Sequence, residues 1–209
     1  MSTDGDAVRR RLPPIARRAL IIDAARRVIA EQGLTGATVR EIAAAAGVRP
    51  GTITHHFASI EELLTEVLHF ESDRFGQELT AAISARSCAM AGLQAIGEVM
   101  LADRPEVRDH WRIWLDLWAR ASHDAPLAEW QAGRYRDLRR LVRDVIAQGV
   151  EQGELRGVDP EAAAVDVVAM VDGLAIQAFL EMGELTPETA RRHLAEALEQ
   201  RFALQPGPG

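Results

Sequence analysis

The sequence lacks lysine altogether and contains a single cysteine, Cys88, among its 209 residues. One cysteine excludes an intrachain disulfide, and we interpret Cys88 as a small buried apolar residue rather than as a redox sensor. We attribute the absence of lysine to the base composition of the genome. The positive charge of the protein is therefore carried by arginine alone.

Long apolar runs are also absent. No run reaches the roughly 18 residues that a membrane-spanning helix requires. The first residues carry arginines, followed by Pro13 and Pro14, where a signal peptide would have its apolar core. We therefore expect a cytoplasmic protein that has no contact with a membrane.

Patterns typical of enzymes and metal sites are missing as well. No segment shows the alternation of a β-strand, so no glycine-rich phosphate loop follows a strand. His55 and His56 are adjacent, and on a helix they would point about 100° apart, which does not suit a shared metal ion. The carboxylates lie on polar helix faces, where they are most simply solvated charges. We predict no enzyme activity, no metal site and no cofactor.

The net charge of −7 is divided unevenly along the chain. Residues 1–60 hold 9 arginines against 5 acidic residues, whereas residues 61–209 hold 15 arginines against 26 acidic residues. This division predicts a basic module joined to an acidic body. A nucleic acid would attract the first part and repel the second.

Apolar residues recur at helical spacing through most of the chain, which predicts an all-α protein of about nine helices. Helix starts are indicated by Thr38, Ser59, Asp159 and Thr186 as N-caps, and by prolines at first helical positions. The expected helices cover 15–32, two short segments within 38–57, 59–85, 88–101, 105–121, 124–152, 161–182 and 187–202. We predict a flexible arm (1–14), a three-helix DNA-binding domain (15–60), a helical ligand-binding and dimerisation domain (61–204) and a disordered tail (205–209).

Residues 38–64 read TVREIAAAAGVRPGTITHHFASIEELL and are the most informative segment. Gly47 stands where the chain must turn sharply between two short helices, often at positive φ. Ile42 places an apolar side chain on the first helix, and Ile53 and Phe57 continue that face on the second. The spacing predicts a helix-turn-helix whose second helix presents polar side chains to the major groove of DNA.

This segment resembles the DNA-binding region of the TetR family of bacterial transcription regulators, and it is most similar to the choline-responsive, BetI-type branch. Two positions depart from the family pattern: Thr54 replaces a frequent tyrosine, and Ile60 replaces a frequent lysine. The resemblance rests on Ala24, Ala25, Ile29, Gly33, Thr38, Val39, Ile42, Ala43, Ala46, Gly47, Val48, Gly51, Thr52, His56, Phe57, Glu62, Leu63 and Leu64. It implies a homodimeric regulator, most often a repressor, that a small molecule releases from a near-palindromic DNA operator.

The DNA-facing candidates come from the helix-turn-helix. Arg40 and Arg49 can reach backbone phosphates, and helix-end N–H groups near Gly51 can do the same. Thr52, Thr54 and His55 are candidates for base edges or nearby phosphates, while His56 can contact the phosphate backbone or the helix below it. The full set is Thr38, Arg40, Arg49, Pro50, Gly51, Thr52, Thr54, His55 and His56.

Three tryptophans at helical spacing, Trp111, Trp114 and Trp118, share one helix face. Such residues either fill a core or line a ligand pocket. Aromatic faces attract cations, and acidic residues such as Asp116 and Asp172 are available nearby, so we predict a cationic or mixed apolar inducer. The predicted ligand-binding residues are His110, Trp111, Trp114, Asp116, Trp118, Met170 and Gln177.

The last two predicted helices carry long apolar stripes. In the TetR family two such helices meet their copies in a four-helix interface, which implies a homodimer here. The residues predicted at that interface are Val168, Val171, Ala175, Phe179, Leu194, Leu198 and Phe202. Two further functions remain open at the level of the sequence: an all-helical enzyme that acts on a small molecule, and a protein-binding adaptor that does not read DNA.

Overall fold

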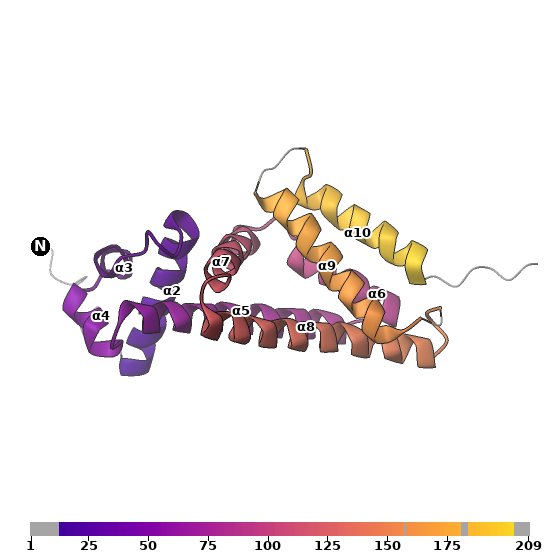
Figure 1. The fold of residues 1–209 in the computed structure, drawn as a ribbon, viewed down its shortest axis with the longest axis horizontal. Coiled ribbons are helices and arrows are strands. Elements are labelled where there is room, and N and C mark those ends of the chain that lie inside the picture. The colour runs from indigo at the N-terminus through magenta and orange to yellow at the C-terminus, as the bar shows by residue number, and fades with distance from the viewer. Residues whose placement is uncertain (1–12, 157, 181–183, 203–209) are drawn as a thin grey trace, which may run out of the picture. The chain divides into compact units, whose positions relative to one another are not determined.

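The computed structural model describes residues 13–156, 158–180 and 184–202, and within these residues it contains helices and no strand (Figure 1). The all-α prediction is confirmed. The predicted arm and tail fall almost wholly outside the described residues, except that Pro13 precedes the first helix and Pro14 begins it. The helices are α2 (Pro14–Gln32), α3 (Val39–Ala46), α4 (Pro50–His56), α5 (Ile60–Ser84), α6 (Ala89–Met100), α7 (Pro105–Ala121), α8 (Ala125–Glu151), α9 (Pro160–Phe179) and α10 (Pro187–Phe202).

Local signals set where these helices begin. The Thr38 hydroxyl accepts the N–H of Glu41 at 3.3 Å while the Glu41 carboxylate accepts the N–H of Thr38 at 3.1 Å, which forms a capping box. Asp159 accepts the N–H of Glu161 at 3.1 Å at the start of α9. Because these bonds satisfy N–H groups that the helix itself leaves without partners, the helices begin where the sequence predicts.

The chain divides into two compact units, which meet in sequence between Glu71 and Ser72. The first contains α2, α3, α4 and the start of α5. Its core is formed by one face of each helix, with Ile21, Ile42, Ile53 and Leu63 at most 1% exposed. Packing of α2 on α3 and of α3 on α4 holds the helix-turn-helix together.

The second unit contains the rest of α5 and α6 to α10. Within it α8 packs on α9, α10 packs on both α6 and α9, and α7 packs on α8 and α9. Helices α6 and α8 approach each other closely at Gly149, where an added Cβ would lie 2.4 Å from the Cβ of Ala89. A side chain at that position would therefore push α6 and α8 apart.

The apolar stripes of α9 and α10 point into this unit. Phe179 and Phe202 are 2% and 0% exposed in the single chain. The same holds for the other residues predicted at a dimer interface, namely Val168, Val171, Ala175, Leu194 and Leu198, each at most 5% exposed. These seven side chains therefore pack the core of one chain and, as placed, are not available to a second copy.

A different face of α9 remains uncovered. Val165 is 47% and Leu180 43% exposed, which is unusual for large apolar side chains. Among the described residues, α9 alone is long and apolar enough to cross a membrane by length and composition, and just under half of its apolar window is buried. Since it carries Glu161, Asp166 and Asp172 and packs on α8 and α10, we interpret it as a core helix with one open face.

One expectation about a single residue was wrong. Cys88 is exposed rather than buried, because it is the N-cap residue of α6 and its side chain lies outside the helix packing. The sequence pattern predicts a helix that begins at Cys88 itself, whereas the helix begins one residue later.

Candidate functional site

The turn between α3 and α4 is set by Gly47. This residue has φ 63° and ψ 34°, in the left-handed region that glycine adopts at low cost. The N–H groups of Gly47 and Val48 donate to the carbonyl oxygens of Ala44 and Ala43 at 3.1 and 2.9 Å. The chain therefore leaves α3 sharply, and Pro50 begins α4 three residues later.

The short helix α4 divides clearly into two faces. Ile53 is 1% exposed, and Phe57, which follows the helix, is 2% exposed, so both anchor α4 in the core of the first unit. The nine residues predicted to meet DNA are all exposed or partly exposed: Thr38, Arg40, Arg49, Pro50, Gly51, Thr52, Thr54, His55 and His56. They come from the start of α3, from the turn and from the outer face of α4, which is the arrangement that a groove-reading helix requires.

Two residues show how the outer face of α4 can approach DNA. A Cβ added to Gly51 would meet nothing within 4 Å, so the fold itself leaves that space open. The Thr54 hydroxyl donates to the Gly51 carbonyl oxygen at 3.2 Å. Because its proton is engaged within the helix, Thr54 presents an acceptor oxygen and a methyl group outward, which suits an amino group or a thymine methyl.

The charge of His56 is also set locally. Desolvation lowers the pKa of its imidazole, and the nearby positive charges of His55, Arg18 and Arg17 lower it further. The free protein therefore holds His56 largely neutral near pH 7. In that form it offers a hydrogen bond to a phosphate but no positive charge.

The second unit contains a cavity of about 600 Å³, a volume within the range typical of small-molecule sites. Five helices contribute to it: α5, α6, α7, α8 and α9. Its wall consists of Ser72, Asp73, Phe75, Gly76, Gln77, Leu79, Thr80, Ala81, Met100, His110, Trp111, Trp114, Arg134, Tyr135, Asp137, Leu138, Leu141 and Asp172.

Aromatic rings stack along one side of this cavity. The His110 ring lies 3.8 Å from the Phe75 ring and 5.6 Å from the Trp114 ring, centroid to centroid, and is nearly parallel to Trp114. The Trp111 indole N–H donates to the Met100 carbonyl oxygen at 2.7 Å, and Trp111 is 1% exposed. Trp111 is therefore held as a core residue whose edge reaches the cavity, while Trp114 forms part of the aromatic stack.

The cavity also holds a hydrogen-bonded pair of titratable groups. The Tyr135 hydroxyl donates to Oδ2 of Asp172 at 2.8 Å. Burial raises the pKa of the Asp172 carboxyl to about 6, and the hydrogen bond from Tyr135 opposes that rise. Burial and the neighbouring Asp172 carboxylate raise the pKa of Tyr135, so the phenol stays protonated. Perturbed groups of this kind inside a cavity are typical of functional sites.

The seven residues predicted to bind a ligand are divided by the structure. His110, Trp111 and Trp114 line the cavity. Trp118 lies outside the wall, and a side-chain hydrogen bond with it opposes the rise in the pKa of Tyr135. Gln177 also lies outside the wall; it is exposed and donates to the Gly173 carbonyl oxygen at 3.0 Å. Asp116 and Met170 are partly exposed and lie outside the wall as well.

Sequence reasoning omitted most of the wall from its predicted site. The contributions of α5 and α8 mix apolar residues such as Phe75 and Leu138 with polar ones such as Gln77, and no local signal marks these positions as cavity-lining. Tyr135 was the available signal, since it is the sole tyrosine of the chain and follows Trp130 by five residues.

Comparison with known proteins decides between the open functions. A family model described as "Bacterial regulatory proteins, tetR family" matches residues 21–67. A second, described as "BetI-type transcriptional repressor, C-terminal", matches residues 89–203, more than half of the chain. The chain belongs to the TetR family, with a BetI-type C-terminal region.

Individual relatives support the same assignment. The HTH-type transcriptional regulator BetI of Cronobacter sakazakii is 30% identical over 196 residues, which cover 92% of this chain and 93% of the relative. A Saccharomonospora viridis structure, described as a transcriptional regulator in complex with choline, is 25% identical with a TM-score of 0.86 and covers 91% of this chain and 100% of that one. A Rhodococcus structure, described as a TetR-family transcriptional regulator, is 30% identical with a TM-score of 0.75 and covers 88% and 97%.

This TetR-family protein is therefore a ligand-responsive, DNA-binding transcription regulator of the repressor type, and not an enzyme. The helix-turn-helix of the first unit is its DNA-binding module. Its C-terminal region is of the ligand-binding kind. Homodimers are typical of the family.

Proposed function

We propose that this regulator is a cytoplasmic repressor whose inducer is a small organic cation of the choline class, bound in the cavity of the second unit. The observation that carries the proposal is the presence of the Asp172 carboxyl in the same cavity wall as the aromatic stack. Support comes also from the Saccharomonospora viridis relative, whose structure holds choline.

The chemistry of a quaternary ammonium group suits this wall. Such a group has no N–H to donate, so it is recognised by aromatic faces and by a nearby negative charge. The ring of Trp114 supplies a face, and Asp172 supplies the charge once it is ionised. The Tyr135 hydroxyl holds the carboxylate in place through its 2.8 Å hydrogen bond.

On the DNA side, α4 is the proposed recognition helix. Thr52, Thr54 and His55 would meet base edges, because they lie on its exposed face. Arg40 and Arg49, together with the first N–H groups of α4, would hold phosphates on either side. Thr38 and Pro50 shape the starts of α3 and α4, and neutral His56 would donate a hydrogen bond to the backbone.

The proposed dimer uses the open face of α9 rather than the buried stripes. Apolar and small residues follow one another along this face at spacings of three and four: Ala162, Val165, Ala169, Gly173, Ile176 and Leu180. Burial of this face against a second copy would remove it from water and bring the two recognition helices into a symmetric pair. A twofold pair reads half-sites about 34–36 Å apart, or a multiple of that spacing.

Induction follows as a shift between two conformations of the dimer. A ligand changes the equilibrium only to the extent that it binds one conformation better than the other. Because α5 runs from Ile60 to Ser84, it belongs to both units, and it also lines the cavity with Phe75. A cation that reorders this wall therefore acts on the helix that leads to the DNA-binding unit.

The test uses the tightest duplex that the purified protein recovers from a randomised library. Choline should release this duplex, whereas the uncharged carbon analogue, in which a tert-butyl group replaces trimethylammonium, should not. Release by both compounds, or by neither choline nor larger quaternary ammonium ions, would refute the proposed ligand class. Sequence-selective retention of the duplex would be unaffected by that result, because it depends on the first unit.

A further inference from the structure

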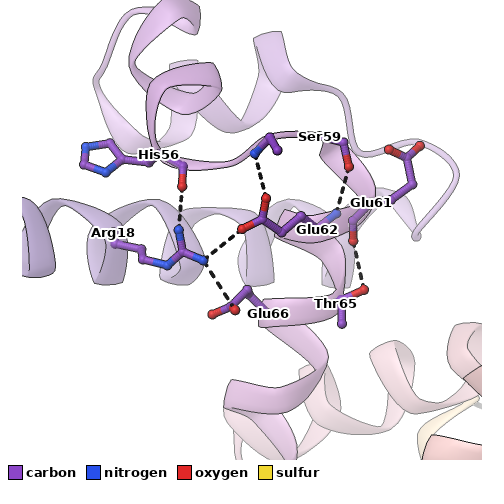
Figure 2. A network of polar contacts seen from close by, with 8 residues as sticks. Arg18, His56, Ser59, Glu61, Glu62, Thr65 and Glu66 are labelled. Carbon is purple, nitrogen blue, oxygen red and sulfur yellow. Dashed lines mark hydrogen bonds and ion pairs between the residues drawn. The ribbon is translucent and has the colours of Figure 1, made fainter.

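The guanidinium group of Arg18 on α2 joins three segments of the DNA-binding unit (Figure 2). Its Nη1 donates to the main-chain carbonyl oxygen of His56, the last residue of α4. Its Nη2 lies 3.2 Å from Oε1 of Glu62 and 3.3 Å from Oε1 of Glu66, both in the first two turns of α5. One side chain of α2 therefore contacts the end of the recognition helix and the beginning of the next helix.

The same guanidinium covers Phe57, the C-cap residue that follows α4. Its central carbon lies 4.1 Å from the centroid of the Phe57 ring, which is 2% exposed. The last carbonyl groups of a helix have no partner within the helix, and a cation is favoured beside them. Arg18 supplies both the donor and the charge at the C-terminal end of α4.

The link between α4 and α5 is held from the other side by Glu62. One of its carboxylate oxygens accepts the N–H of Ala58 at 2.6 Å, while the hydroxyl of Ser59 accepts the N–H of Glu62 at 3.1 Å. The bond from Ala58 and then the bond from Arg18 lower the pKa of the Glu62 carboxyl, which therefore stays ionised near neutral pH. Every residue between the two helices is thus tied to α2 or to α5.

These ties matter because α4 has little to hold it otherwise. It is 7 residues long, far below the length at which a helix is stable alone, and no side chain caps its N-terminus. Ile53 and Phe57 anchor it by apolar contact, which is not directional. The Arg18 clamp (Arg18, Glu62 and Glu66) combines hydrogen bonds to His56 and Glu62 with an ion pair to Glu66, and its hydrogen bonds are directional and act at one defined end of the helix.

We propose that Arg18 is a positioning residue for DNA recognition. It fixes the direction of α4 by holding its C-terminal carbonyl group against the start of α5, and it does so without contacting DNA. Its contribution to operator binding is therefore one of geometry rather than of phosphate neutralisation. This proposal concerns the DNA-binding unit and is independent of the identity of the inducer.

The experiment measures binding of the library-selected duplex across a series of salt concentrations for Arg18→Gln and Glu66→Gln. Arg27→Gln is the matched control for Arg18, because Arg27 lies on the same helix and pairs with Asp23, one turn away on that helix, at 2.8 Å. Glu61→Gln is the control for Glu66, since it removes the same charge from the start of the same helix. Thermal unfolding of each variant shows whether it is folded at the assay temperature.

We expect Arg18→Gln to weaken binding about tenfold or more relative to Arg27→Gln, the scale of charge-assisted hydrogen bonds. Its salt dependence should match that control, because no phosphate contact is lost. Glu66→Gln should bind less tightly than Glu61→Gln. Weaker DNA binding by Glu66→Gln would be informative, since removal of a negative charge beside DNA by itself strengthens binding.

Two results would overturn the proposal. In the first, the salt slope of Arg18→Gln falls by about 0.9 below that of its control, which would make Arg18 a phosphate ligand. In the second, both clamp variants bind as their controls do. If Arg18→Gln is unfolded at the assay temperature, the comparison of Glu66→Gln with Glu61→Gln tests the proposal instead. Glu66→Gln keeps Arg18 and its direct contact with His56, and loses only the charge of Glu66.

Discussion

The sharpest prediction concerns the carboxyl group of Asp172. Burial raises its pKa from 3.8 to about 6, which corresponds to about 3 kcal/mol against the ionised form. Because the pKa in the folded state lies above that in the unfolded chain, this group stabilises the fold fully below about pH 4, and the contribution is lost as the pH rises through about 6. Near neutral pH the empty cavity therefore carries an ionised carboxylate at a cost that a bound cation would offset.

The substitution Asp172→Asn removes the charge and keeps the shape, since the Asn carbonyl oxygen can still accept from Tyr135. We expect the free energy of unfolding near neutral pH to rise, by at most about 3 kcal/mol. Choline affinity at about pH 7.5 should fall about tenfold or more, the value of one lost charge contact. In the unsubstituted protein, affinity at about pH 5 should be about a tenth of its value above pH 7, because only that fraction of Asp172 is ionised.

Calorimetric titration with choline at constant ionic strength measures this dependence, because the charge of choline does not itself change with pH. Urea unfolding across the same pH range measures the stability. Asp144→Asn is the control, since Asp144 is exposed on α8 and pairs with Arg143. Unchanged choline affinity and an unchanged pH profile in Asp172→Asn would show that Asp172 does not recognise the cation, and the aromatic stack would then have to account for binding alone.

Three further predictions concern the DNA-binding unit. Gly51→Ala should raise the free energy of unfolding by up to about 1 kcal/mol yet weaken DNA binding, because the added methyl group enters the open space where a phosphate would approach. Gly133→Ala on α8 is the control and should leave DNA binding unchanged; if the two variants bind DNA equally well, Gly51 lies off the interface. Gly47→Ala should cost about 1–2 kcal/mol in urea unfolding, the strain of a left-handed alanine, and no loss would contradict the positive φ. Arg49→Ala should lower the slope of log affinity against log salt by about 0.9, whereas an unchanged slope would exclude a phosphate contact.

Short stretches of sequence determine where most helices begin and where the chain turns. Caps such as Thr38 and Asp159, and prolines at the first positions of helices, act on N–H groups two or three residues away, so helix starts can be predicted without knowledge of the fold. The same is true of Gly47, because the left-handed turn after α3 depends on the conformational freedom of one residue. The helix-turn-helix is therefore the part of the candidate site that sequence alone indicates best.

Helical periodicity says that a face is apolar but not what covers it. Phe179 and Leu198 have the spacing of a dimer interface, yet both are buried within one chain, while the less apolar face with Val165 stays open. An apolar stripe looks the same in sequence whether it packs against its own chain or against a second copy, because the hydrophobic effect is non-directional. Only the packing of α9 between α8 and α10 distinguishes the two.

The ligand cavity likewise depends on contacts between distant segments. Tyr135 and Asp172 are 37 residues apart in sequence, and Phe75 is separated from His110 by an entire helix and its loops. Whether a buried-type side chain fills a core or lines a cavity is decided by how closely its neighbours from other helices approach. The sequence by itself determined the helices and their ends through local hydrogen bonding and backbone freedom, whereas the cavity, the raised pKa of Asp172 and the open face of α9 arose only when the helices packed.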